Sequence, residues 1–546
     1  MVLSERDFIA IAERAANLSD YRSGKYFIAD KPGADLRTRE QVDSWLAKTT
    51  DNPMHLRNSS VLPQWTVELQ QMLSALSTLE FGPRRSSMLA SLCECGPRYG
   101  LHRLEKMLST GLKSYLCRRA TRRFTNELQK RIVWTTRPCF SLELRAFMRA
   151  RNAISSFEHR LSAQILEREF LGEKPQDRLF RMFKRFPVLP RLWSQLICDW
   201  CDHVTEFLTR FDADRKAISR TFLGGRPINK ITDLRCGLSD PHNAGRAVIL
   251  VQFHSGSVFY KPRPGNGELE WQKLMRFINV HSFQPELRAA SALLRGDYCW
   301  MERIEFFPCK NTTAANRFYR RLGGLMAAAC LTKTVDCHRD NLIASGEYPV
   351  LIDTETLWHS SGKAKNLGWV DVLRQTGFIP TSHRRRTWQY RSSVLSAKTR
   401  PGQHTPRIGF EPLTAMNYDR KIIEGFAMAW QCILGTPKRR LDLARSIRRI
   451  FSHNRRRIYC STASYDAIRR KSIQPCFLRS GILRDLFITQ LCRRKGIPAA
   501  VVNRETRALS NLDIPYFVHK GNWSGIERKI APPEVVLRAI RETLQW

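Results

Sequence analysis

The sequence has no long apolar run: no stretch approaches the roughly 20 uninterrupted apolar residues that a membrane helix needs. The first seven residues carry charges and lack the apolar core of a secretory signal. The 15 cysteines follow no regular spacing, and an odd number cannot pair completely within one chain. These absences predict a protein without a membrane span in a reducing compartment, and we expect it to be cytoplasmic.

Glycine-rich phosphate loops are also missing. Neither the G-x-x-x-x-G-K-[S/T] pattern nor the G-x-G-x-x-G pattern occurs in the sequence. Both patterns shape backbone cradles for nucleotide phosphates. Their absence argues against the commoner nucleotide-binding folds.

Positive charge dominates the composition. Lysine and arginine number 90 against 50 acidic residues, which gives a formal net charge of +40. Such a surface attracts nucleic acid, ATP, acidic peptides or anionic lipid. An arginine-biased composition spread over a solvated surface would give the same number, so the charge does not decide the function.

Cys198, Cys201 and His203 have the spacing of half a zinc site. A structural zinc site needs four ligands, usually from two such pairs, and the sequence has no second pair at a suitable distance. Neighbouring apolar residues recur at helical spacing. We therefore expect these cysteines to be buried on a helix, and we interpret Cys93 and Cys95 in the same way.

Apolar spacing divides the chain into two predicted domains. Residues 1–180 carry apolar residues three and four positions apart and are predicted to be mostly helical. Residues 181–546 begin with a further helix and then change to strand-like patterns. Runs of β-branched and aromatic residues around a turn predict a hairpin at about 247–264. The rest of this domain is predicted to hold helices at 267–280 and 314–331, a hairpin at 342–352, a basic irregular segment at 359–412 and helices at 413–546.

The strongest chemical pattern surrounds the second hairpin. Asp336, His338 and Asn341 precede it, and Asp353 and Glu355 follow it. Because the strands of a hairpin run antiparallel, these two groups meet at one end. Phosphoryl transfer needs a group that orients the attacking hydroxyl, oxygen ligands for Mg²⁺ and a cation on the phosphates. The order of these residues resembles the catalytic and metal loops of phosphoinositide-type kinases.

Lys261 ends the second strand of the first hairpin and is the candidate cation. In a kinase-like N-terminal lobe, a strand lysine contacts the α- and β-phosphates. A lysine at a strand end is usually solvated, and a single Asp-x-His is usually a turn or capping element. The combination of these elements in this order favours a kinase-like site.

Five blocks of the sequence resemble hallmark blocks of type 2 lanthipeptide synthetases, the LanM family. They are 238–242 (LSDPH), 259–263 (FYKPR), 336–344 (DCHRDNLIA), 348–357 (YPVLIDTETL) and 513–517 (DIPYF). The resemblance spans about 185–520 in consistent order. It implies an α+β fold with a lipid-kinase-like, two-lobed catalytic core and additional helical regions before and after it.

The resemblance also implies an activity. A dehydratase of this family uses ATP and Mg²⁺ to phosphorylate Ser and Thr in a ribosomally made precursor peptide, which has a leader and a core. It then eliminates phosphate to leave dehydroalanine or dehydrobutyrine. The residues implied for phosphorylation are Lys261 on the nucleotide phosphates, Asp336 and His338 at the hydroxyl and transferring phosphoryl group, and Asn341, Asp353 and Glu355 on metal and nucleotide.

The elimination step is implied for four further residues. Asp240 and His242 match an Asp-x-His pair of the family, and Arg456 and Thr462 match a later Arg and Thr. An arginine suits a departing phosphate because its planar guanidinium binds oxyanions in bidentate fashion. Either His242 or Lys261 could act in proton transfer, and the sequence does not choose between them.

The sequence departs from the family pattern in places. Residues 337 and 339–340 differ in the catalytic loop, but none of them has an implied chemical role. Cys460 and Ser461 stand where the family tends to have Arg-Pro, a departure that could remove one phosphate contact of the elimination step. Full synthetases continue into a zinc-dependent cyclase, which we do not expect in these 546 residues. A separate cyclase, an uncyclised product and a truncated gene product remain open.

Two alternatives remain beside the dehydratase: a phosphotransferase that leaves phosphopeptides, and an inactive relative that acts as a basic binding scaffold. The expected partner is the precursor peptide, together with a separate cyclase if one exists, and nucleic acid is not expected. The basic run at 383–386 is either an activation-loop equivalent or a solvated loop.

Overall fold

The structure is a computed structural model. It describes residues 4–17, 20, 64–79, 87–154, 169–172, 175–357, 368–380, 393–395, 401–434, 436, 438, 442, 445, 454–520 and 533–545. The chain divides into two compact units, each assembled from separate stretches. The first unit consists of residues 1–215, 228–254 and 460–515, and the second of 216–227, 255–459 and 516–546.

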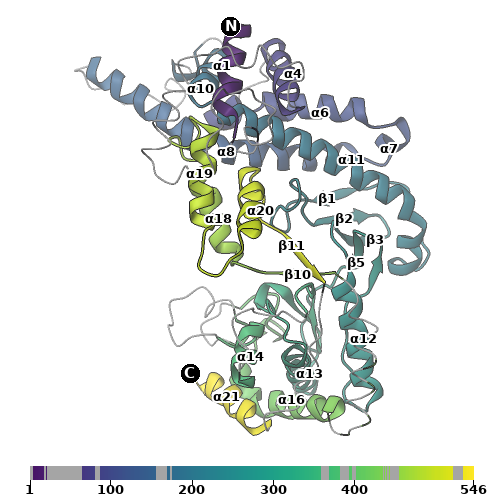
Figure 1. The fold of residues 1–546 in the computed structure, drawn as a ribbon. Helices are drawn as coiled ribbons and strands as arrows, with labels where there is room; N and C mark the ends of the chain where they lie inside the picture. The colour runs from purple at the N-terminus through teal and green to yellow at the C-terminus, as the bar shows by residue number, and fades with distance from the viewer. Residues whose placement is uncertain are drawn as a thin grey trace. The chain divides into compact units, whose positions relative to one another are not determined.

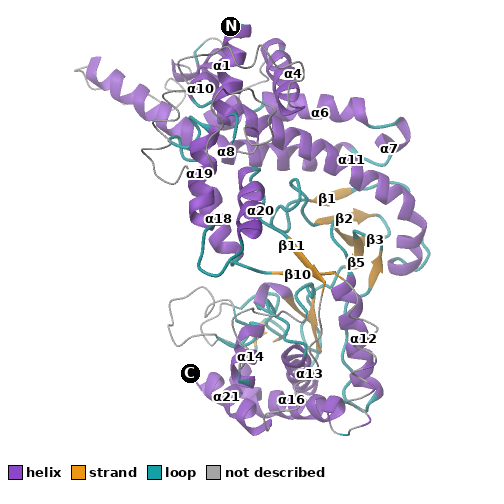
Figure 2. Ribbon diagram, in the orientation of Figure 1, coloured by secondary structure: helices purple, strands orange, loops and turns teal. Residues whose placement is uncertain are grey.

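Helices make up most of the first unit (Figures 1 and 2). They are α1 (Glu5–Ala15), α4 (Gln64–Thr78), α5 (Met88–Leu92), α6 (Cys95–Met107), α7 (Thr110–Ser114), α8 (Arg118–Ile154), α10 (Pro175–Arg185), α11 (Val188–Phe222, through residue 215), α18 (Thr462–Ser472), α19 (Gly481–Cys492) and α20 (Ala499–Ser510). Strands β1 (Asp233–Arg235) and β2 (Ile249–Phe253) pair antiparallel, with Leu234 opposite Val251.

Helices α8 and α11 form the framework of this unit. Two buried tryptophans of α11 anchor it on α8: the indole of Trp193 donates to the Thr136 hydroxyl at 2.9 Å, and that of Trp200 donates to the Phe124 carbonyl at 3.1 Å. Each indole N–H is thereby satisfied inside an apolar core. Cys198 and Cys201 are buried on the same helix, which confirms their interpretation as helix-core residues.

The second unit combines small sheets with helices. Its strands are β3 (Gly256–Lys261), β4 (Ala292–Leu294), β5 (Cys299–Glu302), β6 (Leu342–Ser345), β7 (Tyr348–Leu351), β8 (Arg407–Ile408), β9 (Glu411–Pro412), β10 (Asn454–Arg457) and β11 (Phe517–Lys520). Its helices are α12 (Asn266–Val280), α13 (Thr312–Leu331), α14 (Trp369–Thr376), α16 (Asp419–Leu434) and α21 (Pro533–Gln545), with 3-10 turns η1 (Arg339–Asn341) and η2 (Ala415–Tyr418). The fold is α+β, as the sequence predicts.

Strand pairing in the second unit is antiparallel throughout the described ladders. β5 lies between β3 and β4, with Lys261 opposite Cys299. β6 and β7 form the hairpin predicted at 342–352, and Leu342 pairs with Leu351. The ranges 454–457 and 517–520 are far apart in the sequence but pair as β10 and β11. This last pairing has no local signal in the sequence.

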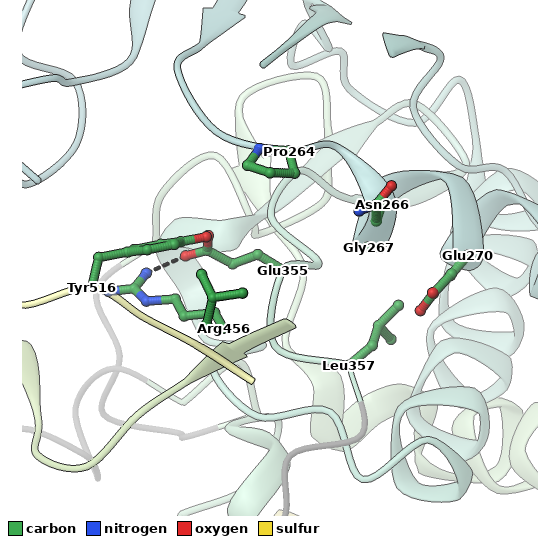
Figure 3. A pocket seen from close by; sticks show the side chains of 9 residues that line it. Pro264, Asn266, Gly267, Glu270, Glu355, Leu357, Arg456 and Tyr516 are labelled. Atoms are coloured by element: carbon green, nitrogen blue, oxygen red, sulfur yellow. Dashed lines mark hydrogen bonds and ion pairs between the residues drawn. The ribbon is translucent and has the colours of Figure 1, made fainter. Parts of the chain in front are cut away.

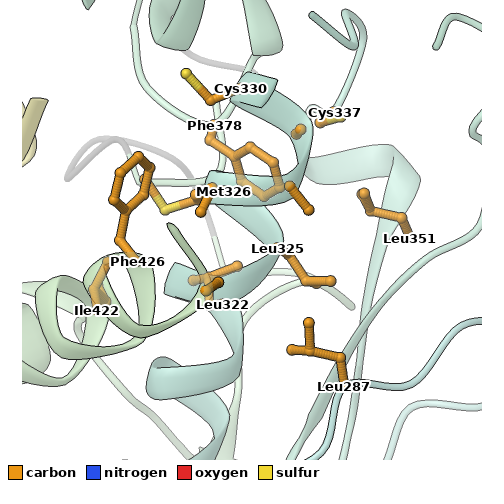
Figure 4. Packing of buried hydrophobic residues seen from close by; sticks show 14 of the residues in the cluster. Leu287, Leu322, Leu325, Met326, Cys330, Cys337, Leu351, Phe378, Ile422 and Phe426 are labelled. Atoms are coloured by element: carbon orange, nitrogen blue, oxygen red, sulfur yellow. The ribbon is translucent and has the colours of Figure 1, made fainter. Parts of the chain in front are cut away.

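The core of the second unit surrounds α13, which is buried along most of its length (Figure 4). One side of α13 packs on Ile422 and Phe426 of α16. The two helices approach so closely that a Cβ atom built on Gly323 would lie 1.9 Å from the Ile422 carbonyl oxygen. Glycine at the crossing therefore lets the two backbones come into contact.

The predicted irregular segment 359–412 is partly regular, so the prediction is wrong for residues 369–376. Helix α14 forms there because Val372, Leu373 and Thr376 lie on one buried face. It ends at Gly377 in the left-handed conformation, with a φ of 93°. The short strands β8 and β9 also fall in this segment. The basic run at 383–386 lies outside the described residues.

Among the helices in the described ranges, none combines the length and the apolar character required to cross a bilayer.

We predict that Gly425→Ala destabilises the second unit strongly. A Cβ at this position would lie 1.8 Å from the Arg320 carbonyl oxygen of α13, so the two helices would have to move apart. Overpacking of this kind costs about 3 kcal/mol. Urea unfolding measures the change. Gly296→Ala is the matched control, since its Cβ would meet nothing within 4 Å, and it should shift stability by less than about 0.5 kcal/mol.

Candidate functional site

Lys261 is the last residue of strand β3. It is buried inside the second unit, with 6% of its surface exposed. Its Nζ donates to Glu268 Oε1 at 3.1 Å and to the Ile352 carbonyl at 2.6 Å. Ile352 follows strand β7, so the lysine joins the end of one strand to the end of a separate hairpin. The ammonium group has three N–H bonds, and these contacts use two of them.

Arg263, two residues further along, binds three carboxylates. Its guanidinium lies 2.7 Å from Glu268 Oε1, 2.9 Å from Asp353 Oδ1 and 2.9 Å from Glu355 Oε2. The planar fork of arginine allows several such contacts at once. Arg263 thus joins α12 to the acidic loop that follows the hairpin.

The charges in this cluster hold one another ionised. Burial alone would raise the pKa of Glu268, but Arg263 and Lys261 outweigh it and lower that pKa to about 2. Burial likewise opposes ionisation of Glu355, and Arg263 and Arg456 lower its pKa. Burial would lower the pKa of Arg263, whereas its three carboxylates raise it. Buried charges are tolerated when each has a partner of opposite sign.

Arg456 of β10 approaches the same cluster and donates through Nη1 to Glu355 Oε1 (Figure 3). Its guanidinium lies 5.2 Å from the ring centroid of Tyr516, whose hydroxyl donates to Glu355 Oε2 at 3.4 Å. These side chains border a cavity of about 100 Å³. The other residues that line it are Pro264, Asn266, Gly267, Glu270, Leu357 and Val518.

The start of α12 packs directly on the acidic loop. A Cβ atom on Gly267 would lie 2.3 Å from the Thr354 carbonyl oxygen, so a side chain at this position would displace the loop. Glu268 is the next residue. The close backbone contact therefore fixes the position of Glu268 relative to the acidic loop.

The loop before the hairpin is tightly folded around His338. Asp336 has a φ of 69°, and its Oδ1 lies 3.2 Å from His338 Nε2. His338 Nδ1 accepts from the Asp340 amide at 3.2 Å, which places the proton of the neutral ring on Nε2, facing Asp336. Burial would lower the pKa of His338, but Asp336 and other acids raise it. Asn341 Nδ2 donates to the Asp336 carbonyl at 2.9 Å.

The C-terminal end of helix α14 packs against this loop. The Cys337 amide donates to the Thr376 carbonyl at 2.7 Å, and a Cβ on Gly377 would lie 3.2 Å from the Cys337 carbonyl carbon. The positive φ of Gly377 favours glycine, and this close approach leaves little room for a side chain. At the other end, the Ile352 amide donates to the Asn341 carbonyl at 3.0 Å. The two ends of the predicted catalytic segment therefore meet, as the hairpin predicts.

The residues predicted for elimination are distributed over both units. Arg456 belongs to the second unit, whereas Asp240, His242 and Thr462 belong to the first. Asp240 and His242 lie in the loop before β2, and His242 Nδ1 donates to the Ile514 carbonyl at 2.7 Å. Thr462 begins α18, and Ser461, one of the family departures, caps this helix by accepting from the Ser464 amide.

Sequence reasoning assigned no role to three members of the cluster: Arg263, Glu268 and Tyr516. Arg263 and Tyr516 stand within blocks that carry the family resemblance, so a signal for them was present. Glu268 lies outside those blocks, on a helix that packs by the Gly267 contact. Its role follows from tertiary structure alone.

The fit to Mg²⁺ differs among the three predicted ligands. Asp353 has a side chain 32% exposed, and Asn341 offers an amide oxygen beside the same loop end. Both are hard oxygen donors of the kind Mg²⁺ accepts, with phosphates and water to complete the shell. Glu355 fits less well because its oxygens are held by Arg263, Arg456 and Tyr516. In the part of the chain that the structure describes, no three His, Cys, Asp or Glu side chains group as a metal site by themselves.

Two comparisons place the chain beside known proteins. A family model described as "Domain of unknown function (DUF4135)" matches residues 186–400 and 386–520. The lacticin 481/lactococcin biosynthesis protein LcnDR2 of Lactococcus lactis subsp. lactis is 25% identical over 128 residues. That match covers 22% of this chain and 14% of the relative's own length.

We predict that Glu268→Gln lowers the free energy of unfolding by about 3–5 kcal/mol, since it leaves Lys261 and Arg263 buried without their shared anion. Chemical denaturation measures the loss. The contrast is Glu424→Gln, which breaks an ion pair with Arg320 at a glutamate 42% exposed and should cost less than about 1 kcal/mol. Equal losses of unfolding free energy in the two variants would contradict the assignment of Glu268 as the buried anion that Lys261 and Arg263 share.

We also predict that the contribution of Glu268 to the free energy of unfolding depends on pH. The folded-state pKa of Glu268 lies at about 2, below the ordinary value of 4.5, so the wild type gains stability from this group above pH 4.5. That gain disappears as the pH falls toward 2. The stability difference between wild type and Glu268→Gln should therefore be constant from pH 7 to 5 and narrow in acid, as measured by unfolding at each pH.

Proposed function

The chain belongs to the DUF4135 family, whose domain is found in LanM-type lanthipeptide synthetases, and we propose from this premise that it dehydrates Ser and Thr in lanthipeptide biosynthesis. The matched range 186–520 agrees with the extent of the resemblance in the sequence. The partial match to a lacticin 481/lactococcin biosynthesis protein supports a ribosomally made precursor peptide as the substrate.

The first step of the proposed reaction is phosphoryl transfer from ATP. The oxygen of a Ser or Thr hydroxyl bonds to the γ-phosphorus, the bond to the β-phosphate oxygen breaks, and ADP leaves. Asp336 orients the hydroxyl and takes up its proton, with His338 hydrogen-bonded to its carboxylate. Lys261 contacts the nucleotide phosphates. When bound by Asn341 and Asp353, Mg²⁺ would neutralise charge on these phosphates.

The observation that carries this proposal is the link between the lysine strand and the acidic loop. Lys261 Nζ lies 2.6 Å from the Ile352 carbonyl, one residue before Asp353, and Arg263 holds Asp353 at 2.9 Å. These two contacts tie together the segments that carry the proposed phosphate-binding cation, Lys261, and the proposed metal-binding carboxylate, Asp353. Preorganised charges of this kind supply most of the catalysis in phosphoryl transfer. We propose that β3 and the β6–β7 hairpin belong to the two lobes of a lipid-kinase-like core.

The second step of the proposed reaction is β-elimination. A base removes the Cα proton of the phosphorylated residue, the electron pair forms the Cα–Cβ double bond, and phosphate leaves with the Cβ–O electrons. Arg456 would stabilise the departing phosphate, and Thr462 and Asp240 would belong to the same machinery. His242 would serve as the base. Its Nδ1 donates to the Ile514 carbonyl, so the lone pair of the neutral ring is on Nε2, where a proton can be accepted.

A phosphotransferase that does not eliminate is the second candidate, and one observation favours it. The Arg456 guanidinium is bound to Glu355 and lies over Tyr516. A phosphate would have to share or displace this contact. The two candidates differ in product: dehydrated peptide for the first, phosphopeptide for the second.

We further propose that the protein works in the cytoplasm on a precursor with a leader and a Ser/Thr-containing core. This partner is inferred from the family alone.

We predict that the protein, incubated with MgATP and its cognate precursor peptide, removes water from the peptide, and that Asp353→Asn reduces this activity at least about 100-fold. The loss has the size expected when a group that stabilises transition-state charge is removed. Mass spectrometry resolves each loss of water and each phosphate adduct. Asp371→Asn is the matched control, because Asp371 lies on the surface of α14 with a side chain 53% exposed.

In the same assay, Arg456→Ala should accumulate phosphopeptide while phosphorylation continues. Phosphopeptide from the wild type would favour the second candidate. Unchanged precursor with folded wild-type protein would contradict both, and chelation of Mg²⁺ should stop either reaction.

A further inference from the structure

The loop that carries His242 has an unusual backbone. Asn243, Ala244 and Gly245 follow one another with φ angles of 46°, 67° and 76°. A left-handed conformation is readily adopted by glycine, is tolerated by asparagine and is unfavourable for alanine. Three such residues in succession persist only where surrounding structure holds them. The loop therefore depends on contacts outside itself.

Asp513 provides the principal contact. Its Oδ2 accepts from the Ala244 amide at 2.6 Å, and its Oδ1 accepts from the Gly245 amide at 2.9 Å. The residue is 4% exposed, so its carboxylate is almost entirely removed from water. Burial raises the pKa of Asp513 above its ordinary value, and the two amide donors and Arg131 offset only part of that rise. Both oxygens of one carboxylate thus bind the strained backbone.

The next residue, Ile514, binds the start of the same loop. Its amide donates to the Pro241 carbonyl at 2.8 Å, and its carbonyl accepts from His242 Nδ1 at 2.7 Å. A carbonyl oxygen accepts only, so Nδ1 carries the proton and Nε2 of the neutral ring carries the lone pair. One short segment, residues 513–514, therefore fixes the loop backbone, the ring orientation and the tautomer of His242.

Three further contacts hold the loop. The His242 and Arg246 backbones exchange hydrogen bonds of 2.9 Å in both directions. Arg131 of α8 donates to the Gly245 carbonyl at 2.8 Å, and Arg246 binds both oxygens of Glu206 on α11. The loop is thereby attached to the two framework helices of the first unit.

We propose that Asp513 is a positioning residue for the elimination step: it holds the 241–246 loop in the one conformation that presents His242 Nε2 as a base. The proposal rests on the proposed function, because it assigns His242 to proton abstraction. Asp513 itself takes no part in the chemistry. It acts through the backbone of the loop and through the Ile514 carbonyl that follows it.

The test is the partition between two products in Asp513→Asn. An asparagine offers one acceptor oxygen in place of two and turns an amide NH₂ toward the other loop N–H. We expect elimination to slow by about 10- to 100-fold, the range that accompanies a misplaced catalytic group, while phosphorylation is maintained. Phosphopeptide should therefore accumulate, as read by mass spectrometry. With purified phosphopeptide as substrate, the loss should fall on kcat rather than on KM.

Asp485→Asn is the matched control. Asp485 is also a buried carboxylate of the first unit, but its oxygen accepts from the Ser510 hydroxyl. It should destabilise the unit without changing the ratio of phosphorylated to dehydrated peptide. Hydrogen exchange of residues 241–246 gives a readout that needs no activity: the Ala244 and Gly245 amides should lose protection in Asp513→Asn and keep it in Asp485→Asn.

Each outcome has a distinct meaning. Accumulated phosphopeptide together with lost amide protection supports the proposal. An unchanged product ratio in Asp513→Asn, or the same ratio change in Asp485→Asn, overturns the positioning role although dehydration by the wild type stands. Unmodified precursor with the wild-type protein overturns the proposed function, and the positioning role with it.

Discussion

The second unit depends on one buried carboxylate, Glu268, held between Lys261 and Arg263. Without it, Lys261 would lose its carboxylate partner in a region with little access to water, and Arg263 would keep only Asp353 and Glu355, which is far more costly than the loss of an exposed ion pair. Because Lys261 also binds the end of the β6–β7 hairpin and Arg263 binds the acidic loop, the single anion fixes three separate chain segments. The geometry of the candidate site is a consequence of charge balance.

The +40 net charge has in part a structural explanation. Arg484 is buried and donates to the carbonyl groups of Ser472, Leu509 and Ser510. Arg321 is buried as well and donates to the Glu286 and Glu347 carbonyls. These arginines tie backbone segments together, and Arg321 also forms an ion pair with the Glu347 carboxylate at 3.3 Å. Some of the basic excess therefore belongs to the interior, and the charge is not purely a surface property that attracts polyanions.

The sequence predicted what is encoded locally. The strands around 247–260, the 342–352 hairpin and the order of Asp336 and Asp353 follow from patterns within a few residues. The role of Glu268 could not be predicted, because it depends on a helix that approaches the acidic loop at Gly267. Nor could the pairing of 454–457 with 517–520, which no short-range pattern specifies. Helix α14 was missed because its surroundings are polar and its buried face is only three residues wide.

The discontinuous first unit has a consequence for synthesis on the ribosome. The Ala244 and Gly245 amides find their acceptor in Asp513, about half the chain further on: 269 positions for Ala244 and 268 for Gly245. During translation, the loop that carries His242 emerges long before the residue that shapes it. Closing so long a span is a late event in folding, since nonlocal contacts form after local ones. In a nascent chain, the strands and helices of this region can therefore form well before the 241–246 loop can adopt its final conformation.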